Sequence, residues 1–156
     1  MQNYIKSQTR LAFVQYIFQN EFLNADSSES IEDFQKHFYD TNIAIIDEKK
    51  EFKLKFNKNF LNKLFSSFKN NIDKKNITED LNGFIDINRR FEKWDNILKS
   101  IIFAIIAELL ITDKNKVKIV FNDYLNISKS LVSQKETKLI NAIIQKYIDN
   151  NEFIKK

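Results

Sequence analysis

The chain has almost none of the residues that make tight turns. Its 156 residues include one glycine, Gly83, and no proline, whereas hairpins and strand-rich folds depend on these two residue types at their turns. Fifteen phenylalanines, together with many isoleucines and leucines, still supply enough apolar surface for a core. The composition therefore favours one all-α domain over residues 1–156.

The absence of cysteine and the scarcity of histidine exclude several kinds of chemistry. Without cysteine there is no disulfide, thiolate nucleophile or zinc knuckle, and a lone His37 cannot build a multi-histidine metal site. A single glycine also excludes P-loop and dinucleotide-binding motifs. Acid–base pairs such as Asp80 with Asp86, or Asp123 with Lys129, arise on any helical surface with 29% charged residues. We therefore expect no catalysis, no cofactor and no metal, and a structural or surface role for His37.

No segment predicts export or a membrane span. The opening MQNYIKSQTR lacks the apolar core and cleavage site of a signal peptide. The most apolar run, IIFAIIA at 101–107, is far shorter than the roughly 20 residues that cross a bilayer. The sequence predicts a soluble, cytoplasmic protein.

Charge is distributed in alternating blocks. The net charge is only +4, but residues 22–48 carry seven acids and one lysine, and residues 49–75 carry nine lysines and two acids. Residues 112–146 carry seven lysines and three acids. A fold that gathers the basic blocks would present an anion-binding face.

Apolar spacing predicts about seven helices. The first three cover about 4–23, a segment that carries Ile31, Phe34 and Phe38 after a Ser30–Asp33 cap, and about 59–72. The next three are a short helix from a Thr78 cap to Gly83, a helix over about 92–111, and one around 117–131. The last helix follows a Ser133–Glu136 capping box. Residues 51–56, EFKLKF, alternate as a strand would. With no convincing partner strand, we interpret them as an extended connection.

The predicted helix 92–111, whose apolar stripe begins at Trp94, is apolar on almost all sides, which indicates that protein surrounds it. Glu108 near its end then needs a hydrogen-bonding partner, because an unpaired buried carboxylate is costly. In the next helix, Lys118, Asn122 and Lys129 fall together at the edge of a face formed by Val117, Val120, Phe121, Tyr124, Ser128 and Leu131. That edge is either a solvent-exposed side of the helix or a binding surface for phosphates and base edges.

Two segments share the motifs of one protein family. Near the N-terminus, TRLAFVQYIFQ places Arg10, Ala12, Val14, Gln15 and Phe18 in a characteristic order. In the C-terminal half, KSIIFAIIAELL precedes TDKNKVKIVFNDYLNISKS and TKLINAII, with the matching positions Glu108, Leu109, Asp113, Lys118, Asn122, Asp123, Lys129, Asn141 and Ala142. In order and spacing these segments resemble the NusB family of bacterial transcription antitermination factors, from residue 6 to about 150 and most weakly between 24 and 90.

The resemblance implies an all-α fold of two small packed bundles, about 4–75 and about 78–150, without catalysis. Family members bind the boxA sequence of nascent RNA beside a small-subunit ribosomal protein, called NusE in this role. Their complex helps RNA polymerase to read through terminators in ribosomal RNA operons. The RNA-binding residues expected here are Lys6, Arg10, Gln15, Lys118, Asn122, Lys129, Lys138 and Asn141. We expect four further residues either to pack in the core, which is favoured, or to contact a protein partner: Phe18, Phe22, Trp94 and Leu98.

The chain departs from the family pattern at positions that bear on RNA affinity. Lys6 and Arg10 stand where members often carry an arginine cluster, and Leu139 stands where many have an aromatic residue. A base-stacking contact of about 1–3 kcal/mol is then absent, although Lys135 and Lys138 supply charge. The alternative is a non-catalytic interaction module of the same fold without specific RNA binding, or a homodimer that buries its basic face.

Overall fold

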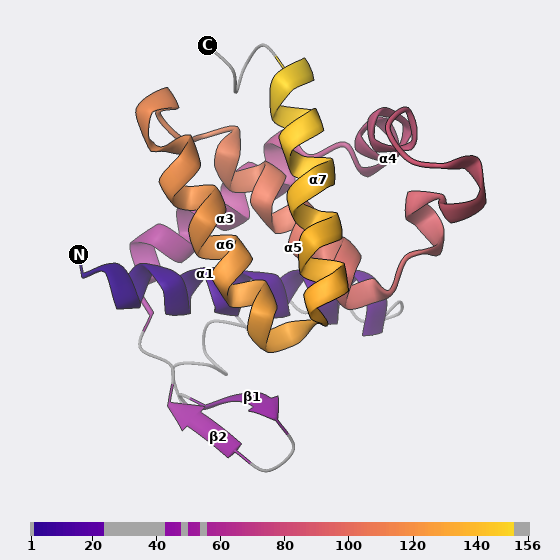
Figure 1. The fold of residues 1–156 in the computed structure, drawn as a ribbon. Coiled ribbons are helices and arrows are strands. Elements are labelled where there is room, and N and C mark those ends of the chain that lie inside the picture. The colour runs from indigo at the N-terminus through magenta and orange to yellow at the C-terminus, as the bar shows by residue number, and fades with distance from the viewer. Residues whose placement is uncertain (1, 24–42, 48–49, 54–55, 152–156) are drawn as a thin grey trace.

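The computed structural model describes residues 2–23, 43–47, 50–53 and 56–151 and confirms the all-α prediction for the body of the chain. Six α-helices lie in the described residues, packed around a shared interior (Figure 1). Their bounds are α1 Asn3–Phe18, α3 Lys58–Asn71, α4 Lys74–Asn82, α5 Asn96–Leu109, α6 Val117–Leu131 and α7 Gln134–Asn150.

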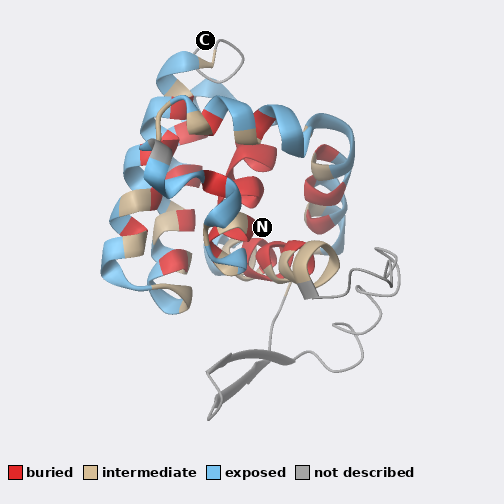
Figure 2. Ribbon diagram, turned by 90° about the vertical axis from the view of Figure 1, so that its right-hand side faces the viewer, coloured by how far each residue is buried: buried red, intermediate tan, exposed pale blue. Residues whose placement is uncertain are grey.

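Helix α5 is the centre of the fold. Every residue from Ile101 to Leu109 is buried, and α1, α3, α6 and α7 all contact this helix. Burial of the neighbouring helices' inward faces is visible in Figure 2. The prediction that protein surrounds this helix is confirmed. Its start is later than predicted, because Phe91–Lys93 forms a 3-10 turn and Trp94 is extended, so Trp94 precedes the helix.

The N-terminal helix reaches Leu23 as predicted, but with a change of winding. After α1 ends at Phe18, residues Gln19–Leu23 form a π-helical turn. Such wider turns change the direction of the side chains that follow. A polar side chain, Asn20, and two phenylalanines, Phe18 and Phe22, lie at this change.

Side-chain caps begin α3 and α4. The Asn57 side chain accepts a hydrogen bond from the Phe60 N–H at 2.8 Å, and the Asp73 carboxylate accepts one from the Asn76 N–H at 3.2 Å. The prediction of a Thr78 cap is wrong, because Thr78 lies inside α4 and its hydroxyl donates to the Lys74 carbonyl. Gly83 follows α4 as its C-cap, as expected.

Helices α6 and α7 agree closely with the sequence pattern. The predicted face of α6 is buried except for Leu131, which is half-buried. The capping box at the start of α7 is confirmed, because the Glu136 N–H donates to the Ser133 hydroxyl and the Ser133 N–H donates to the Glu136 carboxylate, both at 3.1 Å. A 3-10 turn at Lys114–Lys116 precedes α6.

The interpretation of residues 51–56 as an unpaired connection is wrong for its first part. Strand β2, Lys50–Lys53, pairs antiparallel with β1, Ile43–Asp47. The register joins Ile43 to Lys53 and Ala44 to Phe52, with an irregularity between Ile45 and Asp47. The β-branched residues of IAIID supply the missing partner strand. Figure 1 shows the hairpin below the helical body.

One continuous apolar cluster joins residues from all six helices. It includes Phe13 of α1, Phe65 of α3 and Ile106 of α5, so both halves of the chain contribute to it. The division into two bundles at about residue 75 stays a prediction. The expected helix carrying Ile31, Phe34 and Phe38, and His37 within it, lie outside the described residues.

Candidate nucleic-acid interface

A buried ion-pair cluster joins three helices beside the candidate interface. Arg10 of α1 contacts the Glu108 carboxylate of α5 through Nε, at 2.9 Å to Oε1, and through Nη2, at 2.7 Å to Oε2. Its Nη1 lies 2.6 Å from Asp123 Oδ2 of α6. The two contacts with the Glu108 carboxylate fix the plane of the Arg10 guanidinium group. Arg10 and Glu108 are 7% and 3% exposed, so the charges are paired away from water.

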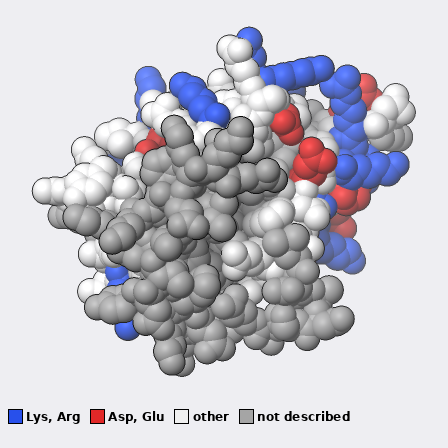
Figure 3. All heavy atoms as spheres, turned by 90° about the horizontal axis from the view of Figure 1, so that it is seen from below, with Lys and Arg blue, Asp and Glu red and all other residues white. Residues whose placement is uncertain are grey.

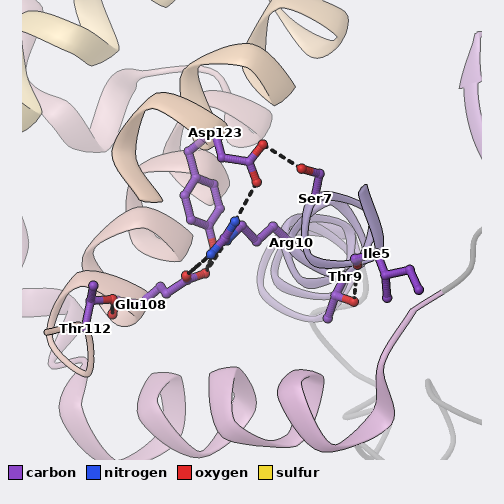
Figure 4. Close-up of polar contacts among 8 residues, drawn as sticks. Ile5, Ser7, Thr9, Arg10, Glu108, Thr112 and Asp123 are labelled. Atoms are coloured by element: carbon purple, nitrogen blue, oxygen red, sulfur yellow. Dashed lines mark hydrogen bonds and ion pairs between the residues drawn. The ribbon is translucent and has the colours of Figure 1, made fainter. Parts of the chain in front are cut away.

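Two hydroxyl groups complete the cluster. The Tyr124 hydroxyl donates to Glu108 Oε1 at 2.8 Å, and the Ser7 hydroxyl donates to Asp123 Oδ1 at 2.6 Å (Figure 4). The guanidinium carbon also lies 5.4 Å from the Phe60 ring centroid, within cation–π range. Each carboxylate thus has at least two donors, which offsets much of the cost of its burial.

The cluster changes the acid–base properties of its members. Burial alone would lower the pKa of Arg10, but its hydrogen bond to Glu108 and the charge of that carboxylate outweigh burial and raise the pKa. Burial raises the pKa of Tyr124, and the negative charge of Glu108 raises it further. Arg10 is therefore permanently charged and Tyr124 permanently protonated near neutral pH, which keeps the network intact.

The cluster supplies the hydrogen-bonding partners that the buried Glu108 needs and accounts for the position of Asp123. The expected partner of Glu108 is Arg10, 98 positions earlier in the chain, and Tyr124 is the second. Asp123, which interrupts an apolar helix, turns inward to Arg10 and Ser7, while its neighbour Asn122 is exposed. Arg10 itself, expected to touch RNA, is buried in this network. Its position makes it a tether between α1, α5 and α6.

Four of the expected RNA-binding residues line one groove between α6 and α7. This α6–α7 groove has a volume of about 370 Å³. Its lining residues are Asn122, Leu125, Asn126, Lys129, Thr137, Lys138 and Asn141. Both lysines and all three asparagines are exposed, and the lining includes no acidic residue. The groove therefore offers ammonium groups for phosphates and amides for base edges.

Lys129 and Lys138 face the groove from different helices. The Lys129 ammonium lies 3.3 Å from the Asn126 side-chain oxygen, which holds it along the α6 side. Lys138 lies opposite, in the first half of α7. Lys118 is exposed one turn before Asn122 on α6, so it extends the same helix edge toward the N-terminal end of α6.

The remaining expected RNA residues lie apart. Lys6, half-buried on α1, lines a larger central cleft bounded by α1, α3 and the start of α6, and Asn122 lines both the cleft and the groove. Gln15 is nine residues from Lys6, about two and a half helical turns, so it lies on the opposite side of α1. The structure places Lys6 in the cleft that adjoins the groove, and Gln15 lines neither of them.

Of the four residues expected to pack in the core or face a partner, one is buried and three are half-buried. Leu98 is 4% exposed and belongs to the core. Phe22 and Trp94 are half-buried against that core. The Lys99 ammonium lies 4.9 Å from the Phe22 ring centroid, and the Trp94 indole N–H donates to the Arg89 carbonyl at 2.9 Å. Phe18 is also half-buried, so these three rings retain some surface for a partner.

Charge alone does not single out a binding surface. On the face seen in Figure 3, basic side chains extend from the edge of the molecule with acidic ones among them. The α6–α7 groove combines lysines with amides and has no acidic residue in its lining. Sequence reasoning missed Asn126, although its spacing of four residues from Asn122 is a usable signal.

The described part of the chain shows neither a candidate metal-binding cluster nor a candidate membrane span. The described residues contain no group of three histidine, aspartate or glutamate side chains that could hold a metal ion. Within the same part of the chain, no helix combines the length and the apolar character that a membrane span needs.

Comparisons with known proteins agree with the motifs. A family model described as the NusB family matches residues 7–149. The transcription antitermination protein NusB of Rickettsia conorii is 27% identical over 141 residues, which cover 90% of this chain and 89% of that protein. The protein of the same name from Rickettsia felis is 26% identical over 149 residues, covering 96% and 94%. The Rickettsia bellii protein is 24% identical over 147 residues, covering 94% and 92%. No solved structure matches the chain.

Proposed function

Because this chain belongs to the NusB family, we propose that it is a transcription antitermination factor that binds single-stranded boxA RNA together with the ribosomal protein NusE. In this role it supports read-through of ribosomal RNA operons as part of the antitermination complex of RNA polymerase, in the cytoplasm. Its contribution is binding, without catalysis. The grouping of lysines and amides in the α6–α7 groove, without an acidic residue, is the observation that carries the proposal.

The RNA-binding surface that we propose consists of the exposed edge of α6, the facing part of α7 and Lys6. Lysines contact phosphates, which supply salt-dependent affinity, and asparagine amides read the edges of unpaired bases. The members are Lys6, Lys118, Asn122, Asn126, Lys129, Lys138 and Asn141. We leave two of the expected residues out of this surface: Arg10, which holds α1 against α6 and would act indirectly, and Gln15, which lies on the opposite side of α1 from Lys6.

NusE would bind a different part of the surface. The half-buried rings of Phe18, Phe22 and Trp94 lie outside the lining of the α6–α7 groove. Aromatic rings with one exposed edge are enriched in protein interfaces. A partner there leaves the groove open to RNA, so that both can be bound at once.

We expect the double variant Lys129→Ala/Lys138→Ala to bind boxA RNA about 10- to 100-fold more weakly than the parent protein, because two phosphate contacts are lost. Fluorescence anisotropy of labelled boxA RNA and of a scrambled RNA, each with and without NusE, measures this. Lys146→Ala is the matched control, because Lys146 is exposed on α7 and does not line the groove.

Preferential binding of boxA that tightens with NusE supports the proposal. Equal and feeble binding of both RNAs, unchanged by active NusE, contradicts it and favours an interaction module that has no specific RNA ligand. The oligomeric state at the concentrations used, from sedimentation, then tells whether a second copy of the chain occupies the basic face.

A further inference from the structure

Three depressions on the surface join end to end. The α6–α7 groove shares Asn122 and Asn126 with the central cleft, which has a volume of about 750 Å³. The cleft in turn shares Lys63 and Ile111 with an α3 groove of about 470 Å³. The α3 groove is lined by Asn62, Lys63, Ser66, Ser67, Asn70, Asn71 and Ile111. Together they form one continuous track from α7, across the edge of α6, to the outer face of α3.

Lysines and asparagines line all three parts of the track, and the acidic residues of the lining lie in the central cleft. Lysines occur in each part, and six basic residues face three acidic ones in the combined lining. Two of the three carboxylates, Glu108 and Asp123, are already bound to Arg10. The third is Asp113. Ammonium groups therefore dominate the charge that a ligand would meet.

Polar side chains follow the lysines in each part. On α3, Ser66 and Asn70 are exposed one turn apart, and Lys63 is exposed about one turn before Ser66. In the cleft, Lys116 is exposed in the turn before α6. Ile111, 45% exposed, adds apolar surface at the junction of the cleft and the α3 groove. An ammonium, an amide or hydroxyl, and a small apolar surface suit the phosphate, base edge and sugar of a nucleotide.

We propose that the central cleft and the α3 groove continue the RNA site, so that single-stranded RNA longer than the α6–α7 groove runs on past Asn122 to Lys116, Lys63 and Asn70. This inference rests on the RNA-binding function proposed above. A linear, flexible polyanion suits this arrangement better than a folded protein does, since the three depressions adjoin in succession and lysines and amides line each of them. Nucleotides that flank boxA would contact the α3 groove, and these contacts would not depend on the nucleotide sequence.

The test compares two RNAs on the full-length protein: boxA alone, and boxA extended by about ten unpaired nucleotides on each side. Lys63→Ala and Lys116→Ala are each expected to weaken binding of the extended RNA about three- to tenfold, with a salt dependence lowered by about 0.7 in log–log slope. Neither should change binding of the short RNA. The matched controls are Lys69→Ala on α3 and Lys114→Ala in the turn before α6, both exposed and outside the lining of the track.

Equal affinity of the parent and the Lys63 and Lys116 variants for the extended RNA would overturn the inference while leaving the groove intact as an RNA site. Weakened binding of NusE at unchanged affinity for both RNAs would also overturn it and assign the cleft to a protein partner. A different failure, in which the parent protein binds neither RNA but does bind NusE, would remove the proposed function itself.

Discussion

Replacing Arg10 by alanine is expected to lower the free energy of unfolding by about 3–5 kcal/mol. The substitution removes the cation that Glu108 and Asp123 share and leaves the Glu108 carboxylate, 3% exposed, with Tyr124 as its remaining side-chain donor. An uncompensated buried carboxylate costs more than the pair gains, so the loss exceeds that of an exposed ion pair. Thermal and denaturant unfolding of the purified variant measure it.

Arg90→Ala is the matched control for this prediction. Arg90 also binds a carboxylate, with its Nε 2.8 Å from Glu92 Oε1, but both side chains are 48% exposed. Water replaces such a contact readily, so the unfolding midpoint should stay almost unchanged. Similar midpoints for the Arg10 and Arg90 variants would contradict the structural role assigned to the buried cluster.

Phe13→Ala is expected to destabilise the fold by about 3–5 kcal/mol, through lost burial and the cavity that remains. The Phe13 side chain is fully buried. Its ring meets Phe65 at 6.0 Å and Phe68 at 6.2 Å between centroids, both edge to face. These contacts join α1 to α3, so the loss also weakens the wall of the central cleft. Chemical denaturation at equilibrium measures the change.

Ile119→Ala is the surface control: it also truncates an apolar side chain, a smaller one than that of Phe13, but at an exposed position. Ile119 is 68% exposed on α6, and surface substitutions of this kind usually change stability by no more than about 0.5 kcal/mol. If Phe13→Ala cost no more than Ile119→Ala, the packing of α1 on α3 described above would be incorrect.

Local features of the fold could be predicted from the sequence because short-range spacing determines them. The buried face of α6 and the Ser133–Glu136 capping box each involve residues within a few turns of one another. The β1–β2 hairpin cannot be predicted in the same way, because no glycine or proline between IAIID and β2 marks a turn in the sequence. The cap of α4 was misplaced by five residues, because Asp73 and Thr78 are both acceptable cap residues.

The site could be predicted only in part, since its geometry depends on contacts between distant residues. Arg10 and Glu108 are 98 positions apart. No local sequence pattern distinguishes an arginine that pairs with a buried carboxylate from one that contacts RNA. The grouping of Asn122 and Lys129 with Lys138 and Asn141 depends on how α7 packs on α6. Family motifs indicate Asn122, Lys129 and Asn141, and charge indicates Lys138, but only the fold places the four in one groove.

The most direct test of the central claim, that the α6–α7 groove binds the RNA backbone, is the salt dependence of boxA binding in the parent and in Lys129→Ala/Lys138→Ala. Each phosphate contact to a single strand contributes about 0.7 to the slope of log affinity against log salt concentration. The account predicts a slope smaller by about 1.4 in the double variant, with Lys146→Ala parallel to the parent. Parallel slopes for the parent and the double variant would show that the groove does not hold the RNA.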